Sequence, residues 1–227
     1  MADQITRRVL LGSASVALAA SAAGAAVGDK KPLKPGPLKI VGVSCSPRKG
    51  RSTADALAKC LQGAKSANPR VETELIELAG LDIDGSLAAG VKLGKGRKDD
   101  FPSVAKKLAD PSVQGIIIGT PVYFSSMTSV CKAFIERLMV FWRSGGLADK
   151  VVGVVAVGGS RNGGQEVTIR SVQDSLFCYD MVLVGTGSRF GATVWSKAPG
   201  GDKDGMQQAV KLGRRVAETV LALKAGV

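Results

Sequence analysis

The sequence of 227 residues contains no histidine, only four cysteines, and few aromatic residues, which make up 4% of the chain. The absence of histidine excludes every mechanism that uses an imidazole base, and it removes the most common metal ligand. No two cysteines form a C-x-x-C pair or a framework of disulfide spacings; they are Cys45, Cys60, Cys131 and Cys178. We therefore assign no metal ligand and no catalytic acid or base side chain.

Positive charge is in excess, with 31 lysines and arginines against 19 acidic residues and a formal net charge of +12. Such a surface favours anionic partners, for example lipid headgroups or an acidic redox protein, but it says nothing about the fold. The lysines are not interleaved with stacking aromatic residues, so we expect no nucleic-acid binding. With 45% apolar residues, the chain is long enough to bury one good core.

The first residues have the pattern of an export signal rather than of a folded segment. Arg7 and Arg8 precede an uncharged run of mostly Ala, Ser and Gly that continues to Gly28, and residues 23–25 (A-G-A) form a cleavage candidate. A paired arginine before a weakly apolar stretch resembles a twin-arginine signal, and the alternative is an ordinary amphipathic helix. We expect a signal peptide over residues 1–27, a linker over 28–37 and export to the periplasm.

From residue 38 onward, apolar runs alternate with helical patterns, which predicts one α/β domain over residues 38–227. Continuous or alternating apolar runs predict five strands: Leu38–Ser44, Val71–Leu78, Gly115–Thr120, Val151–Val157 and Met181–Val184. Helical spacing is found over Thr53–Ala67, Phe101–Ala109, residues 130–141, Gln165–Phe177 and residues 206–223. The expected architecture is a doubly wound parallel sheet, in which ligands bind beyond the carboxyl ends of the strands.

The loop after the first strand has the composition of a phosphate site. Residues 44–53 (S-C-S-P-R-K-G-R-S-T) combine hydroxyl groups and three cations with the start of a helix, whose backbone N–H groups suit a phosphate dianion. The loop matches neither the P-loop pattern nor G-x-G-x-x-G, which argues against a nucleoside triphosphatase and a dinucleotide site. The alternative is a surface turn with a Ser/Thr helix cap.

Two further loops follow the third and fourth strands. Residues 120–127 (T-P-V-Y-F-S-S-M) place two adjacent aromatic residues beside hydroxyl groups, which suits a flat conjugated ring; the alternative is core aromatics in a turn. Residues 158–166 (G-G-S-R-N-G-G-Q-E) contain four glycines that allow a backbone to lie flat against a ligand; the alternative is a flexible loop.

Taken in order, five motifs resemble the NAD(P)H-dependent FMN reductase and iron–sulfur flavoprotein family. They are S-x-S-P-R-K-x-x-[NS]-T, D-D-F, T-P-V-Y-F, K-A-F-I-E-R and G-G-x-R-x-G-G-Q-E, and they extend from about Leu38 to Val194. The resemblance implies a flavodoxin-like fold with strand order 2-1-3-4-5 and a noncovalently bound FMN. It also implies an oxidoreductase that passes electrons to a small acceptor such as a quinone or a flavin, in a homodimer or homotetramer.

The same resemblance distributes the cofactor over the three loops. It assigns the FMN phosphate to Ser44, Ser46, Arg48, Ser52 and Thr53. It assigns the isoalloxazine ring to Pro121, Val122, Tyr123, Phe124, Ser125 and Ser126, with Gly158, Gly159, Asn162, Gly163 and Gly164 closing over it. Arg161 would either stabilise negative charge on the ring or face solvent.

The sequence departs from this family in two respects. Iron–sulfur members carry a compact cysteine cluster before the D-D-F segment, whereas Leu81–Lys98 contains no cysteine, so a flavoprotein with one cofactor is expected. Cytosolic relatives use a nicotinamide donor, whereas an exported protein would meet little of it. We therefore expect a membrane quinol or a periplasmic redox protein as the electron donor.

Two other functions compete with this interpretation. Cys45 and Arg51 satisfy the C-x5-R-S nucleophile loop of low-molecular-weight phosphatases, but Asp110, the tempting acid, precedes a strand and would lie at the opposite end of the sheet. The second alternative is a non-enzymatic FMN electron carrier like flavodoxin, although flavodoxins are typically acidic and this chain is basic.

Overall fold

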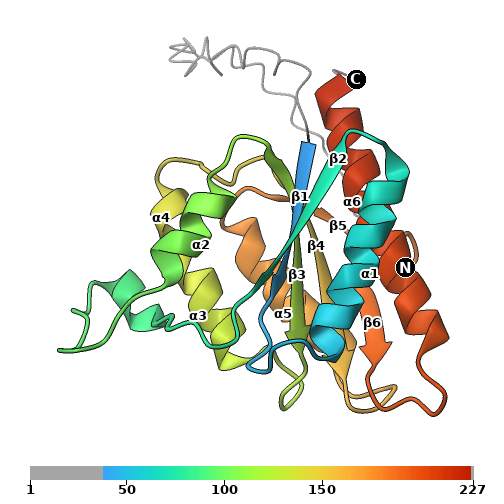
Figure 1. The fold of residues 1–227 in the computed structure, drawn as a ribbon, viewed down its shortest axis with the longest axis horizontal. Helices are drawn as coiled ribbons and strands as arrows, with labels where there is room; N and C mark the ends of the chain where they lie inside the picture. Colours follow the sequence, from blue (N-terminus) through green and yellow to red (C-terminus); the bar gives the residue numbers. More distant parts are fainter. Residues whose placement is uncertain (1–37, 226–227) are drawn as a thin grey trace, which may run out of the picture. The chain divides into compact units, whose positions relative to one another are not determined.

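The computed structural model describes residues 38–225, which form a parallel sheet between two layers of helices (Figure 1). The strands are β1 (Leu38–Ser44), β2 (Val71–Glu77), β3 (Val113–Pro121), β4 (Val151–Gly158), β5 (Val182–Val184) and β6 (Ala192–Trp195). The helices are α1 (Ser52–Ala67), the 3-10 helix η1 (Gly85–Ala89), α2 (Phe101–Leu108), α3 (Ser129–Arg137), α4 (Met139–Trp142), α5 (Gln165–Phe177) and α6 (Lys203–Ala225). The expected signal peptide over 1–27 and linker over 28–37 lie outside the described residues.

The strand order is β2-β1-β3-β4-β5 with every neighbouring pair parallel, which confirms the expected flavodoxin-like topology. The sequence predicts five strands, whereas the sheet has six among the described residues. β5 pairs only with the first half of β4, and β6 pairs with its second half, where Val155 is opposite Ala192. Residues 185–191 leave the sheet between these two segments. β6 was not predicted because a strand of four residues is too short to give a recognisable apolar run.

The core consists of two hydrophobic clusters, one on each face of the sheet, because the central strands point alternate side chains to opposite sides. In β3, Ile116 and Ile118 belong to the cluster that α2, α3 and α5 cover, whereas Ile117 belongs to the cluster under α1 and α6. Figure 1 shows these two groups of helices on opposite sides of the strands. The helix expected over residues 130–141 is divided at Leu138 into α3 and α4.

Helices α1 and α6 cross with their backbones in close contact. A Cβ atom built on Gly63 would overlap the carbonyl oxygen of Val210, and one built on Gly213 would overlap that of Cys60. Because no side chain larger than hydrogen fits at either position, these two glycines set the distance between the helices. The packing of α1 against α6 also positions the first residues of α1, where the candidate phosphate loop ends.

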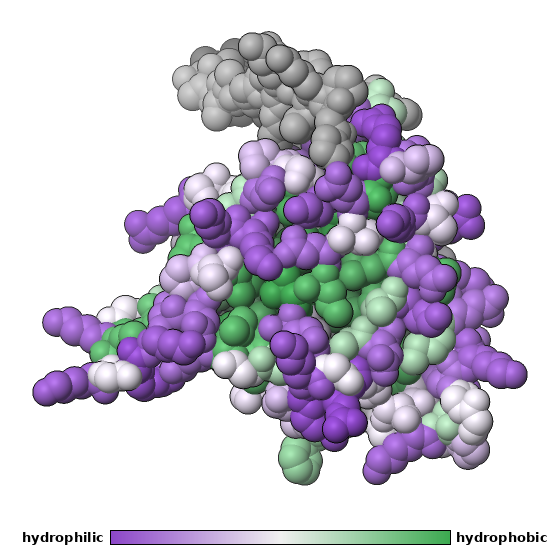
Figure 2. Space-filling view, in the orientation of Figure 1, coloured by the Kyte–Doolittle hydropathy of each residue, from purple (hydrophilic) through white to green (hydrophobic). Residues whose placement is uncertain are grey.

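Edge strand β2 carries charged side chains that discourage pairing with another sheet. The carboxylate of Glu74 contacts the ammonium groups of Lys107 at 2.7 Å and Lys39 at 3.5 Å. Its hydrogen bond from Lys107 lowers the pKa of the Glu74 carboxyl. On the face that β2 crosses, Figure 2 shows a central band of hydrophobic residues surrounded by hydrophilic ones.

Among residues 38–225, no helix combines the length and apolar character needed to cross a bilayer.

Candidate binding site at the carboxyl edge of the sheet

The three loops singled out in the sequence lie at the same edge of the sheet. Because β1, β3 and β4 are adjacent and parallel, the segments that follow them emerge together, at the lower edge in Figure 1. We refer to residues 45–51 as loop 1, residues 122–128 as loop 2 and residues 159–164 as loop 3. The parallel topology therefore gathers the predicted site residues into one region.

Loop 1 is a folded-back turn that leads into α1. The hydroxyl of Ser46 accepts a hydrogen bond from the backbone N–H of Arg48 at 3.1 Å and donates to its carbonyl oxygen at 3.0 Å. The N–H of Gly50, at φ +59°, donates to Glu77 on β2 at 2.8 Å. No side chain caps α1, so the N–H groups of its first turn remain for a ligand.

The predicted phosphate residues lie in loop 1 and at its two ends, where β1 finishes and α1 begins. Ser44, Ser46 and Thr53 are buried, Ser52 is half-buried and Arg48 is exposed. The buried hydroxyl of Ser44 has no hydrogen-bond partner among the described residues, which is costly unless a ligand supplies one. An unpaired hydroxyl, an uncapped helix start and nearby cations are the donor set that a phosphate dianion requires.

Cys45 is a poor nucleophile in this environment. Its side chain is fully buried, and burial, with a smaller effect of the neighbouring Cys131 thiol, raises the pKa of Cys45 well above its usual value. The thiol therefore stays protonated at neutral pH, whereas phosphatase chemistry needs the thiolate. Asp110 precedes β3 and accepts hydrogen bonds from Ser112, at the opposite end of the sheet from Cys45. Both observations argue against the phosphatase alternative.

Loop 2 contains a tight turn in a conformation that ordinary side chains avoid. Phe124 and Ser125 have φ values of 52° and 57°, and Tyr123 and Ser126 exchange two backbone hydrogen bonds of 2.9 and 3.0 Å across the turn. Left-handed backbone costs of order 1 kcal/mol per residue or more, and such strain concentrates at functional sites. The turn exposes Tyr123, Phe124, Ser125 and Ser126 beyond half-buried Val122 and buried Pro121.

Loop 3 is organised by Gln165, the first residue of α5. Its buried side chain accepts a hydrogen bond from the N–H of Gly163 at 2.8 Å and donates to the carbonyl oxygen of Ser160 at 2.6 Å. A Cβ atom on Gly158 would overlap the Gln165 amide, so the glycine is needed for this arrangement. The predicted residues of loop 3 range from exposed Gly159 and Asn162 to half-buried Gly163 and Gly164.

Direct contacts connect loop 2 to both of its neighbours. The Thr128 hydroxyl donates to the carbonyl oxygen of Cys45 in loop 1 at 2.7 Å. The N–H of Val122 donates to Val157 on β4 at 2.9 Å. Gly164, at φ +92°, lies so close to Ser125 that an added Cβ would be 2.8 Å from its hydroxyl. The three loops therefore form one connected surface rather than three independent turns.

This surface fits a planar group that carries a phosphate. Loop 1 supplies the donors for the phosphate, and loops 2 and 3 supply aromatic side chains and glycine backbone for the ring. Three positioning residues were not predicted from the sequence: Thr128, Gln165 and Glu77. Their polar side chains at strand ends or helix starts were a signal, but their partners are distant in sequence. Arg161 lies over Trp195, with its guanidinium carbon 5.4 Å from the ring centroid.

The segment before α2, where iron–sulfur members would place their cysteines, is held by ion pairs. Arg97 contacts Asp82 at 2.5 Å and Asp84 at 2.7 Å. The buried Arg137 of α3 donates to both carboxylate oxygens of Asp99, at 2.9 and 2.6 Å. Across residues 38–225 there is no group of three or more cysteine or acidic side chains arranged to hold a metal ion.

Comparison with known proteins gives a match over most of the domain. The profile of the NADPH-dependent FMN reductase family matches residues 38–195. An iron-sulfur flavoprotein of Methanocaldococcus jannaschii is 34% identical over 196 residues, covering 82% of this chain and 100% of that protein. An iron-sulfur flavoprotein of Methanosarcina thermophila is 31% identical over 187 residues, covering 81% and 95%.

Solved structures agree on the fold. A flavodoxin-type, WrbA-like protein from Agrobacterium tumefaciens superposes with a TM-score of 0.61 at 19% identity, covering 82% of this chain and 98% of that one. An NADH:FMN oxidoreductase crystallised in its apo form gives a TM-score of 0.59 at 20% identity, covering 82% and 89%. At these identities the likeness concerns the arrangement of strands and helices.

Proposed function

Because the chain belongs to the NADPH-dependent FMN reductase family, we propose that loops 1, 2 and 3 hold its cofactor, FMN, for electron transfer to a small acceptor. The observation that supports this most directly is the connection of the three loops through Thr128, Val122 and Gly164. The acceptor class that we propose is a quinone, a free flavin or a similar small molecule. The protein is an FMN-binding oxidoreductase, and the identity of the acceptor is our proposal.

The chemistry divides between cofactor and protein. When bound, FMN supplies the redox chemistry through its own ring, which agrees with a chain that has no histidine. The uncapped start of α1 and the Ser44 hydroxyl would bind the phosphate, and Arg48 would add positive charge. Tyr123 and Phe124 of loop 2 and the backbone of loop 3, held by Gln165, would hold the ring. The side chains thus bind and orient, and none needs to act as a strong base.

We also propose a donor other than a nicotinamide. Residues 1–27 have the features of a twin-arginine signal, and the periplasm contains little free NAD(P)H. A membrane quinol or a periplasmic redox protein would find a basic chain to dock on, in a manner that weakens with salt. We further propose a homodimer or homotetramer with one flavin per chain and no iron–sulfur cluster, because no cysteine lies within Leu81–Lys98.

The cofactor site is tested by extraction and substitution. The purified protein should be yellow and release FMN, with no iron or acid-labile sulfide after anaerobic purification. Replacing Ser46 and Thr53 together by Ala should weaken FMN retention, because both lie buried at the proposed phosphate site. The pair Ser103→Ala and Thr219→Ala is the control, because these hydroxyls, one exposed and one half-buried, lie on α2 and α6 and not at the proposed phosphate site. A colourless protein that ignores added FMN would contradict the assignment.

Anaerobic stopped-flow reduction separates the possible donors. NADH, NADPH and a soluble quinol analogue are each mixed with the oxidised protein, and flavin absorbance is followed. We expect saturable reduction by the quinol and slow reduction by either nicotinamide. Fast, saturable reduction by a nicotinamide alone would contradict the proposed donor and show that the protein is an ordinary NAD(P)H-dependent reductase. Steady-state turnover with a quinone then distinguishes an enzyme from the flavodoxin-like carrier.

A further inference from the structure

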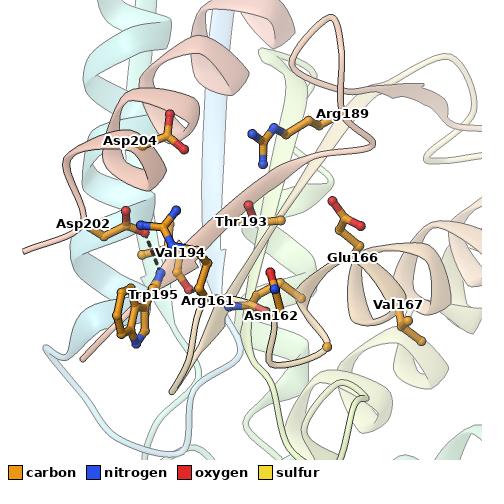
Figure 3. Close-up of a pocket in the computed structure, with 12 residues that line it drawn as sticks. Arg161, Asn162, Glu166, Val167, Arg189, Thr193, Val194, Trp195, Asp202 and Asp204 are labelled. Atoms are coloured by element: carbon orange, nitrogen blue, oxygen red, sulfur yellow. Dashed lines mark hydrogen bonds between the residues drawn. The ribbon is translucent and has the colours of Figure 1, made fainter. Parts of the chain in front are cut away.

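A cavity lies beside loop 3. It has a volume of about 450 Å³ and is bounded by loop 3, the start of α5, strand β6 and the start of α6 (Figure 3). Of the residues assigned to FMN, only Asn162 and Gly164 line it. Its volume is within the range of pockets that bind small organic ligands, roughly 300–1,000 Å³. The cavity is therefore large enough for a ligand of its own.

The walls of this cavity are held in place by hydrogen bonds. The indole N–H of Trp195 donates to the carbonyl oxygen of Gly159 at 3.0 Å, and its backbone N–H donates to Asp202 at 2.7 Å. Gln165 connects the two sides, because it donates to Ser160 in loop 3 and, more weakly at 3.4 Å, to Val194 on β6. A pocket whose walls are already ordered loses little freedom when it binds a ligand.

Two guanidinium groups face this cavity without an acidic partner. The side chain of Arg161 lies over the Trp195 ring, and that of Arg189 points inward from the segment between β5 and β6 (Figure 3). Neither forms an ion pair within residues 38–225. A guanidinium group pairs well with a carboxylate and also stacks on aromatic rings.

The acidic side chains of the cavity are partly occupied by other bonds. Asp202 uses both oxygens at the start of α6, accepting from Trp195 and from the N–H of Gly205 at 3.1 Å. Asp204 accepts from Gln208 at 2.7 Å, which leaves one of its oxygens, like those of Glu166, open to a hydrogen-bond donor. A ligand that suits both the arginines and the open carboxylate oxygens has an anionic group at one end and a hydroxyl group at the other.

We propose that this cavity is a second ligand site, separate from the flavin, for a small aromatic acid that carries a hydroxyl group. Its carboxylate pairs with Arg189, its ring lies against the Arg161–Trp195 stack, and its hydroxyl donates to Glu166 or Asp204. Because loop 3 forms one wall of the cavity, an occupied site also restrains the backbone that borders the flavin.

Calorimetric titration of the FMN-loaded protein tests this site while the flavin site is filled. The probes are 4-hydroxybenzoate, benzoate and the neutral 4-hydroxybenzyl alcohol. We expect 4-hydroxybenzoate to bind most tightly, benzoate more weakly, and the alcohol more weakly still. Arg161→Gln and Arg189→Gln should each raise the Kd of 4-hydroxybenzoate about tenfold or more, since the first removes the cation that stacks with the rings and the second a charge-assisted contact with the carboxylate.

Arg143→Gln is the matched control, because it removes one exposed positive charge outside the cavity and should leave the Kd nearly unchanged. Flavin fluorescence is recorded during each titration. The proposal is overturned if neither acid binds, if all three variants bind like the wild type, or if the acids bind by releasing FMN. Equal affinity for the acid and the neutral alcohol would likewise contradict the role of the arginines.

Discussion

At the scale of single residues, the candidate site depends on a side chain that is not expected to touch the cofactor. The Thr128 hydroxyl, buried between loops 1 and 2, donates to Cys45 and accepts from the N–H of Cys131 at 3.1 Å. It therefore caps the start of α3 and fixes the spacing of two loops with one group. Thr128 therefore controls the geometry of the candidate site without lining it.

Thr128→Val should lower the free energy of unfolding by about 1–3 kcal/mol, because it leaves a buried carbonyl and a buried N–H without partners. FMN affinity should fall as well, since loops 1 and 2 are no longer held together. Thr128→Ser keeps the hydroxyl and should recover most of both losses. Urea unfolding and fluorescence titration with FMN measure the two effects; a valine variant that binds FMN normally would contradict the coupling.

A second residue-scale prediction concerns Asp99 and acid. The hydrogen bond from Arg137 holds the pKa of the Asp99 carboxyl below its usual range. The folded state is thus stabilised above the pKa of about 3.9 that an unfolded Asp has, and this contribution is lost as pH falls through the lower folded value. Asp99→Asn should remove it at neutral pH and flatten the stability profile below about pH 4.

The size of this effect follows from burial. The Arg137 side chain is only 8% exposed, so Asp99→Asn leaves a nearly buried cation with a weaker partner and should cost about 2–4 kcal/mol at pH 7. Asp174→Asn is the control, because its carboxylate pairs with Arg170 at an exposed surface where such pairs contribute about 0–1 kcal/mol. Urea unfolding at pH 3 and pH 7 measures both variants, and equal losses in the two would show that burial is not the cause.

At the scale of elements, the contact between α1 and α6 reverses the usual rule for glycine in a helix. Gly213→Ala would raise helix propensity by about 1 kcal/mol if α6 stood alone. Here the added methyl group overlaps the Cys60 backbone, so the helices must separate, and we expect a net loss of about 1–3 kcal/mol. Gly94→Ala, whose methyl group would meet only ordinary contacts, is the control. Thermal unfolding shows whether Gly213→Ala lowers or raises the stability, and a more stable variant would contradict the close crossing of the two helices.

The elements that sequence analysis predicted well are those whose local pattern and tertiary role agree. β3 and β4 are buried on both faces, and their runs of Ile and Val show it directly. β6 was missed because its four residues are too short to form an apolar run. The break at Leu138 was missed because the apolar spacing continues through it, from Phe134 to Phe141. In the site, the loops were predictable from composition, but the left-handed turn at Phe124 and Ser125 was not, because neither residue favours that conformation.

At the scale of the whole molecule, the paired arginines near the start of the chain predict its destination. Changing Arg7 and Arg8 to Lys should leave the protein unprocessed in the cytoplasm, because the signal depends on the arginine pair rather than on charge. Arg214 and Arg215, an adjacent pair on α6, provide the control when changed to Lys in the same way. Cell fractionation measures the outcome, and a shortened form found outside the inner membrane in the first variant would contradict the signal.

The excursion between β5 and β6 has a consequence for how this protein can be altered. Both flanking segments pair with β4, so the sheet is complete on either side of residues 185–191. Phe190 accepts a hydrogen bond from the Gln173 side chain of α5 at 2.7 Å, and Gly191 lies too close to Val154 for any side chain, so the end of the excursion is part of the packing. The turn over residues 186–189, which includes Arg189, is the part that can change while the sheet persists. Exchanging this turn for others of different length should give a series of proteins that bind the flavin in the same way but bind different ligands in the neighbouring cavity.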